Sequence, residues 1–88
     1  MICKRAFDKF AALHDANPEA LLADGFESAY IGYVANHHNK AVAVYDYMLC
    51  VMELMLDGTT REEAEEYMEF NVLGAYVGED GPLFVMGF

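Results

Sequence analysis

The chain has 88 residues, of which 56% are hydrophobic, and its 15 acidic side chains outnumber five Lys and Arg to give a net charge of −10. This apolar content excludes an intrinsically disordered tail, and the length suits a single compact domain that spans residues 1–88. The negative charge argues against direct binding to nucleic acid or to an anionic membrane surface.

No stretch provides the roughly 20 consecutive apolar residues of a membrane span, because Asp46 and Glu53 interrupt the densest apolar run. The basic residues near the N-terminus are not followed by an apolar segment, so no signal peptide is predicted. Cys3 and Cys50 are too few for a disulfide framework, and Cys50 lies in "MLCVM" as a core residue would. We expect a cytoplasmic protein with reduced thiols.

The N-terminal part predicts two helices. Over residues 2–14 the apolar positions recur at helical spacing, and His14 falls among them as a partly buried core histidine. In "NPEALLADG", Asn17 is a suitable N-cap, Pro18 suits the first helical position and Gly25 would end the segment. A short second helix is therefore expected there.

The middle of the chain predicts a β-hairpin. β-Forming residues flank the turn sequence "NHHN" in "AYIGYVANHHNKAVAVYDY". Alternation would place Tyr45 and Tyr47 on one strand face, if the strand extends that far. Together with Tyr30 and Tyr33, these side chains either complete the core or form an exposed aromatic patch.

A helix is expected from Tyr47 to Leu56, capped by Asp46 and ended by Asp57 and Gly58. Its only charge is Glu53, so it is apolar nearly all round. Exposed apolar side chains on it would favour association. We therefore predict a homodimer with this helix at or under the interface.

The next helix carries the candidate site. Thr59 and Thr60 each precede a glutamate by three residues, which is the capping-box spacing. At about 100° per residue, one face then gathers apolar positions and the opposite face gathers acids. The first set is Ala64, Tyr67, Met68 and Asn71; the second is Glu62, Glu65, Glu66 and Glu69. The acidic face is either solvated or meets a partner.

Gly74 should end that helix, after which "AYV" reads as a short strand, "GEDGP" as a turn and "LFV" as a second strand. Asn71 could satisfy helix carbonyls or a neighbouring strand. The whole pattern predicts an α+β fold with about four helices packed on a small antiparallel sheet, formed by the hairpin and the C-terminal strand.

The segments "AVYDY" and "TREEAEEYMEFNVLGAYVGEDGPLFV" resemble a group of small uncharacterised acidic proteins from phages and prophages. Those proteins end in a similar acid-rich helix, an Asn, a Gly-Ala-aromatic step and a Gly-Glu turn before Pro. The resemblance spans roughly residues 30–85, and Asp80 with Gly81 stand where a shorter or Thr-containing turn is expected. It implies a phage-related setting, in which small acidic proteins often bind host proteins.

The residues favour neither catalysis nor metal binding. Cys3, Cys50 and the three histidines lack metal-ligand spacing, and His37 and His38 would point apart in an extended segment. Ser28 has no nucleophile-elbow context, and no phosphate-binding loop is present. We expect no metal, no cofactor and no catalytic residues.

Residues 41–88 contain ten acids and only Arg61, a balance of −9. This asymmetry predicts a non-enzymatic protein–protein interaction module whose glutamates at 62, 65, 66 and 69 bind a basic surface of a host protein, as an inhibitor or as a mimic of nucleic-acid charge. The acidity could instead serve solubility alone. The alternative function is that of a small enzyme or ligand-binding protein with a pocket between hairpin and helices, near Tyr33, Tyr45 and Asn71.

Overall fold

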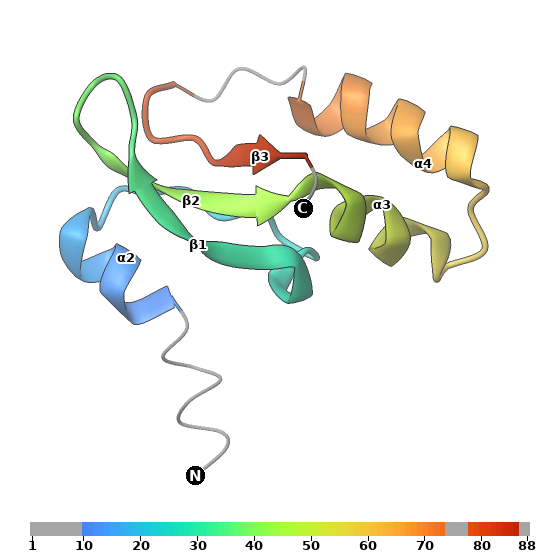
Figure 1. Ribbon diagram of the computed structural model, residues 1–88, viewed down its shortest axis with the longest axis horizontal. Coiled ribbons are helices and arrows are strands. Elements are labelled where there is room, and N and C mark those ends of the chain that lie inside the picture. Colours follow the sequence, from blue (N-terminus) through green and yellow to red (C-terminus); the bar gives the residue numbers. More distant parts are fainter. Residues whose placement is uncertain (1–9, 74–77, 87–88) are drawn as a thin grey trace, which may run out of the picture.

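The computed structural model describes residues 10–73 and 78–86. The elements run in the order α2 (Ala11–Ala16), 3-10 helix η2 (Glu27–Ala29), β1 (Tyr30–Ala35), β2 (Ala41–Asp46), α3 (Tyr47–Met55), α4 (Arg61–Tyr67), π-helix η3 (Met68–Leu73) and β3 (Leu83–Val85) (Figure 1). The α+β class is confirmed. The described residues hold three α-helices, however, and not the four expected.

The three strands form one mixed sheet in the order β1-β2-β3. β1 and β2 form the predicted antiparallel hairpin, whereas β3 runs parallel to β2, with Val44 opposite Leu83. The expectation of an antiparallel C-terminal strand is therefore wrong. A parallel pair requires a long crossover between its strands, and α3, α4 and η3 lie in the chain between β2 and β3.

The central strand β2 organises the core. Its residues from Val42 to Tyr45 are all buried, as expected for a strand covered on both faces. Tyr45 is fully buried, and its hydroxyl accepts a hydrogen bond from the Ala23 N–H at 2.9 Å. Tyr47 lies beyond the strand, in the first turn of α3, so the two tyrosines do not share a strand face.

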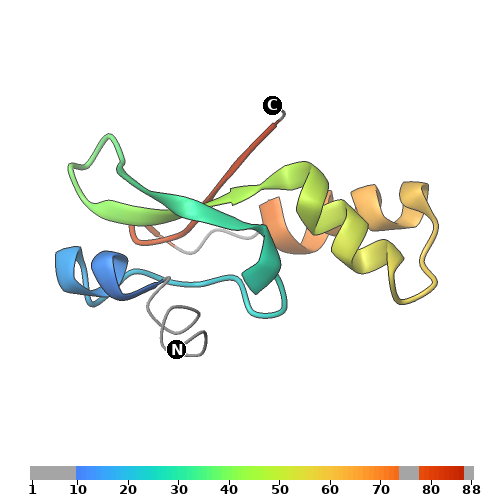
Figure 2. The ribbon, with the colours of Figure 1, turned by 60° about the horizontal axis from the view of Figure 1, so that its bottom comes forward.

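Helix α2 and the segment that follows it lie along one face of the sheet, and α3 and α4 extend beyond its end (Figure 2). The helix expected after Asn17 is absent, since only a turn forms at Pro18 and Glu19. Two N–H groups of this segment make tertiary hydrogen bonds in place of helical ones. Leu21 N–H donates to the Asp80 carbonyl at 3.0 Å, and Ala23 N–H donates to the Tyr45 hydroxyl. Packing against the sheet thus overrides the local helix signals.

The helix predicted over residues 2–14 lies mostly outside the described residues, and α2 ends at Ala16. His14 is exposed, so its prediction as a core histidine is wrong. In α2 the buried residue is Leu13, one position earlier, which packs into the main core cluster. Across the described part of the chain, no helix has the length and apolarity needed to cross a membrane.

Helices α3 and α4 begin at the caps that the sequence predicts. The Asp46 side chain accepts a hydrogen bond from Leu49 N–H at 3.1 Å, and Thr60 with Glu63 forms a complete capping box. The "GEDGP" turn is also confirmed, because Gly81 N–H donates to the Gly78 carbonyl at 3.2 Å. The predicted "AYV" strand falls on residues 75–77, outside the described part of the chain.

Candidate functional site

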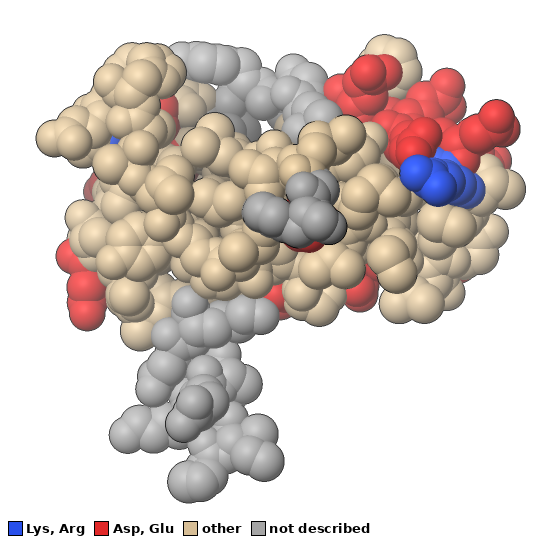
Figure 3. All heavy atoms as spheres, in the orientation of Figure 1, with Lys and Arg blue, Asp and Glu red and all other residues tan. Residues whose placement is uncertain are grey.

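The four predicted site glutamates lie on α4 and the first turn of η3. Glu62, Glu66 and Glu69 are exposed, and Glu65 is half-buried and accepts from Arg61 Nε at 3.0 Å. Acidic side chains gather over this end of the molecule in the space-filling view (Figure 3). The predicted acidic face is therefore present as a surface feature, with three carboxylates open to solvent.

Tyr47 connects this acidic face electrostatically with α3. Burial raises the pKa of the Tyr47 hydroxyl, and the nearby carboxylates of Glu65 and Glu69 raise it further, while Arg61 acts in the opposite direction. The phenol is thus held neutral near the carboxylates. The Tyr47 hydroxyl, at the start of α3, thus lies within the electrostatic influence of Glu65 and Glu69.

The apolar face predicted for this helix is only half correct. Ala64 and Met68 are fully buried, but Tyr67 and Asn71 are exposed. Tyr67 is the last residue of α4 and lies at the edge of the predicted apolar face. Asn71 lies in the π-helix η3, whose i→i+5 hydrogen bonding widens the coil after Tyr67 and changes the angle between successive side chains. A projection that assumes α-helical geometry therefore misplaces residues beyond that point.

Phe70, in η3, is 70% exposed. This ring follows Glu69 directly and lies four positions after Glu66. An exposed aromatic next to carboxylates provides a stacking surface beside hydrogen-bond acceptors, which is the combination that an arginine side chain uses. The helical period already places Phe70 near the acidic face, because residues four positions apart lie on the same side of a helix.

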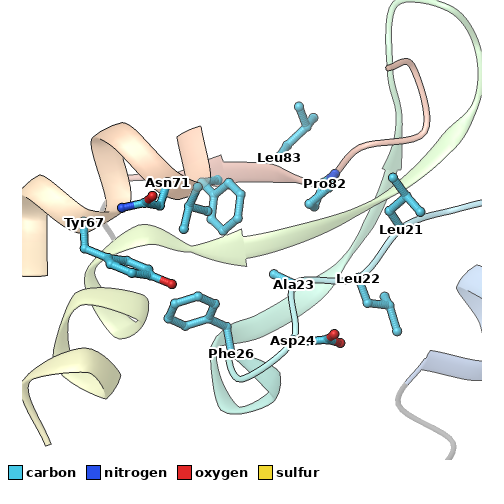
Figure 4. Close-up of a pocket in the computed structure, with 11 residues that line it drawn as sticks. Leu21, Leu22, Ala23, Asp24, Phe26, Tyr67, Asn71, Pro82 and Leu83 are labelled. Atoms are coloured by element: carbon cyan, nitrogen blue, oxygen red, sulfur yellow. The ribbon is translucent and has the colours of Figure 1, made fainter. Parts of the chain in front are cut away.

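A groove of about 570 Å³ lies between η3, β3 and the segment after α2 (Figure 4). It is lined by Leu21, Leu22, Ala23, Asp24, Phe26, Tyr67, Asn71, Val72, Pro82, Leu83 and Phe84. The Tyr67 ring points across the groove toward Phe26, whereas the Asp24 carboxylate is directed away from both Tyr67 and Asn71 (Figure 4). The polar groups therefore do not converge on one point.

This groove only partly matches the expected pocket. Asn71 lines it, but Tyr33 and Tyr45 do not. Tyr45 is buried in the core, where the neighbouring rings of Tyr30 and Phe84 pack against it. Tyr33 is 43% exposed on the edge strand β1. The tyrosines thus divide between core and surface and do not form one patch.

A second apolar surface, the α3 patch, consists of Leu49, Met52, Met55 and Leu56, all exposed. It borders a shallow hollow of about 410 Å³ that Ser28 and Glu53 also line. Ser28 Oγ donates to Glu53 Oε1 at 2.8 Å, which fixes the one carboxylate on this face. The expectation that α3 has more apolar surface than the fold covers is confirmed for these four side chains.

The "GEDGP" turn binds the hairpin loop through polar contacts. Asn36 Nδ2 donates to the Glu79 carbonyl, and the Glu79 carboxylate lies 3.4 Å from His38 Nδ1 and 3.5 Å from Lys40 Nζ. The rings of His37 and His38 lie 4.0 Å apart, because these residues form a turn and not the extended segment in which they would point apart. These contacts hold the "GEDGP" turn against the hairpin loop, so we assign the region a structural role.

Cys50 is buried, and it is the one cysteine among the described residues. Burial, followed by the charges of Asp46 and Glu53, raises its pKa to about 12. A thiol with so high a pKa is a poor nucleophile. Among the described residues no cluster of three His, Cys, Asp or Glu side chains is arranged to hold a metal ion.

Comparison of the chain with protein-family models, with curated proteins and with solved structures found no match. The described part of the chain offers three candidate functional surfaces: the acidic face, the groove and the α3 patch.

Proposed function

We propose that this protein is a non-enzymatic interaction module of phage type, which acts in the cytoplasm of a bacterial host. Its acidic face, made of Glu62, Glu65, Glu66 and Glu69, binds a basic surface of a host protein. The observation that carries the proposal is the exposure of three of these carboxylates on one helical surface. Binding would inhibit the partner or occupy a site that it uses for nucleic acid.

The ion pairs of the described residues support this assignment. Lys40 pairs with Glu79 and Asp80, at the far hairpin loop, and Arg61 pairs with Glu65. Lys40 and Arg61 are the two Lys and Arg residues in the described part of the chain. Neither forms an ion pair with Glu62, Glu66 or Glu69. A basic partner would supply the missing counter-charges and would be steered by the field of the acidic half.

The positions of the acids also support a binding role. Glu62 and Glu66 are four residues apart, as are Glu65 and Glu69, and like charges at this spacing destabilise a helix by about 0.2–0.5 kcal/mol per pair. Acids help a helix at its N-terminus, but Glu69 lies well beyond the first turn of α4. Helix stability therefore accounts for Glu62, in the first turn of α4, and for Glu65, which pairs with Arg61, but not for Glu66 and Glu69. A basic partner would neutralise these two.

The test is affinity capture of host proteins from a bacterial lysate at low and high salt. The variant Glu62→Gln, Glu66→Gln and Glu69→Gln removes the exposed carboxylates, and Glu65 is retained because its loss would release Arg61. The matched control removes three exposed acids elsewhere, through Asp15→Asn, Glu19→Gln and Asp24→Asn. We expect the first variant to lose the salt-sensitive partner and the control to retain it.

Equal capture of the partner by both variants would reject the acidic face as the binding surface. It would leave bulk charge, and hence solubility, as the reason for the acids.

The second candidate function, binding of a small ligand, has one specific observation in its favour. The groove of about 570 Å³ is within the size range of ligand pockets and offers the Tyr67 hydroxyl and the Asn71 amide beside apolar walls. A screen of small aromatic fragments by NMR would test it. Shifts confined to groove residues, and lost in Val72→Phe, would favour this function over protein binding.

A further inference from the structure

The α3 patch has the spacing of a helix-docking surface. Leu49, Met52 and Leu56 stand at i, i+3 and i+7 on one side of α3, with Met55 beside them. Leu56 is 79% exposed and Met52 55% exposed, so these side chains are largely uncovered in the single chain. Apolar side chains at this spacing are the contacts that a second helix covers when it packs along the first.

The charges around the patch limit what can cover it. Residues 46–58 contain Asp46, Glu53 and Asp57 and no Lys or Arg. Glu53 borders the patch itself, where Ser28 holds its carboxylate, and Asp57 follows Leu56 directly. Any protein that covers the patch must therefore place its own side chains beside carboxylates.

A second copy of the chain fits this requirement poorly. Two-fold pairing of the patch with itself would bring the Glu53 carboxylates of both copies into one interface, in a molecule that already carries a net charge of −10. A partner helix with Lys or Arg beside its apolar stripe places opposite charges there instead. A second copy of the chain, as in the homodimer expected from the sequence, is thus the alternative partner for the α3 patch.

We infer that the α3 patch docks the apolar face of a basic amphipathic helix. The inference rests on the proposed protein-binding function and names the chemistry of the partner. The two methionines suit this role, because their flexible and polarisable side chains adapt to different apolar contacts. Basic residues that flank the apolar stripe of the partner helix would lie against Glu53 and Asp57.

The probe is a synthetic amphipathic Leu/Lys peptide of about 18 residues, long enough to form a helix on binding. Its comparison is a Leu/Glu peptide with the same apolar stripe. Binding is measured by fluorescence anisotropy and mapped by NMR on the full chain. We expect the Leu/Lys peptide to shift α3 amides and to bind at least about tenfold more tightly than the Leu/Glu peptide.

The variant Met52→Gln with Leu56→Gln changes the patch without changing charge or helix propensity much. Its control is Ile31→Thr with Val34→Thr, two exposed residues of β1 that line neither the groove nor the hollow at the α3 patch. We expect at least about tenfold weaker binding for the first variant and a change within about twofold for the control. If circular dichroism shows that the patch variant is unfolded, the NMR shifts of the unsubstituted chain show whether the Leu/Lys peptide binds at α3.

Three results of the peptide experiments would each overturn the inference. They are peptide shifts that lie away from α3, equal binding of the two peptides, or an unchanged affinity of the patch variant. A sedimentation mass near twice the 9.9 kDa chain that returns to the single-chain value in the patch variant would also overturn it, in favour of a second copy.

The capture experiment separates this inference from the proposed function. Loss of peptide binding in the patch variant, with lysate capture unaffected by substitution of Glu62, Glu66 and Glu69, would reject the acidic face and keep the docking surface. The reverse pattern would reject the docking surface alone.

Discussion

Asn17 and Asp80, 63 positions apart in the chain, are joined by a hydrogen bond of 2.9 Å from Asn17 Nδ2 to Asp80 Oδ1. The same amide nitrogen donates to the Ala41 carbonyl at 2.9 Å, so one side chain ties the end of α2 to the start of β2 and to the turn before β3. The "GEDGP" turn is therefore held in place by polar contacts with the N-terminal half of the chain.

Replacing Asn17 by Ala should destabilise the fold by about 1–3 kcal/mol, because the Ala41 carbonyl and the Asp80 carboxylate both lose a donor in a half-buried site. Urea unfolding followed by circular dichroism measures the change. Glu19→Ala, at an exposed neighbouring position, is the control and should change stability by no more than about 0.5 kcal/mol. A similar loss in both variants would contradict the role of the amide.

Tyr45→Phe removes the acceptor for the Ala23 N–H while keeping the ring in the core. Leaving that half-buried N–H without its partner should cost about 1–3 kcal/mol. Tyr33→Phe, which removes a hydroxyl from an exposed ring, should cost less than about 0.5 kcal/mol. Thermal unfolding of the two variants side by side gives the comparison, and equal midpoints would show that the hydrogen bond contributes nothing.

The capping box allows a test with adjacent threonines. Thr60→Ala removes the side chain that accepts from Glu63 N–H at 3.2 Å, and it should destabilise the fold by about 1 kcal/mol. Thr59, which has the same sequence spacing to Glu62, is not the N-cap, so Thr59→Ala should be close to neutral. A larger effect at Thr59 than at Thr60 would place the helix start one residue earlier.

Cys50 predicts a loss of stability at alkaline pH. Its pKa is about 12 in the fold and lies near its ordinary value of 9.0 in the unfolded chain, so above pH 9 the unfolded state releases a proton that the folded state keeps. The stability is thus complete below pH 9 and declines as pH rises toward 12. Urea unfolding between pH 8 and pH 11 should show this decline, with a shallower slope in Cys50→Ala. Buried Tyr45, whose pKa is also raised by burial, contributes in the same direction.

The parts of the fold that depend on neighbours in sequence were predictable. The hairpin follows from "NHHN", in which the Asn36 side chain accepts from His38 and Lys40 N–H and Asn39 adopts a φ of 63°. The Asp46 cap and the Thr60–Glu63 box likewise need only residues within three positions. The exposed acids on α4 follow from the helical period alone.

Long-range contacts decided the rest. The segment after Asn17 has helix signals, but its N–H groups bond to Asp80 and Tyr45, which no local pattern can reveal. The direction of β3 depends on how two helices return the chain to the sheet. The groove combines three distant segments, and the exposure of Asn71 depends on a π-helix that its sequence does not announce.

The most direct test of the proposed function is the salt dependence of binding between this chain and the basic protein that it captures, measured by isothermal titration calorimetry. The account predicts that affinity falls steeply with salt, and that substituting Glu62, Glu66 and Glu69 by Gln both weakens binding at low salt and flattens this dependence. The control with Asp15, Glu19 and Asp24 substituted should keep most of the affinity and the slope. The same affinity and slope in both variants and in the unsubstituted chain would contradict the assignment of binding to the acidic face.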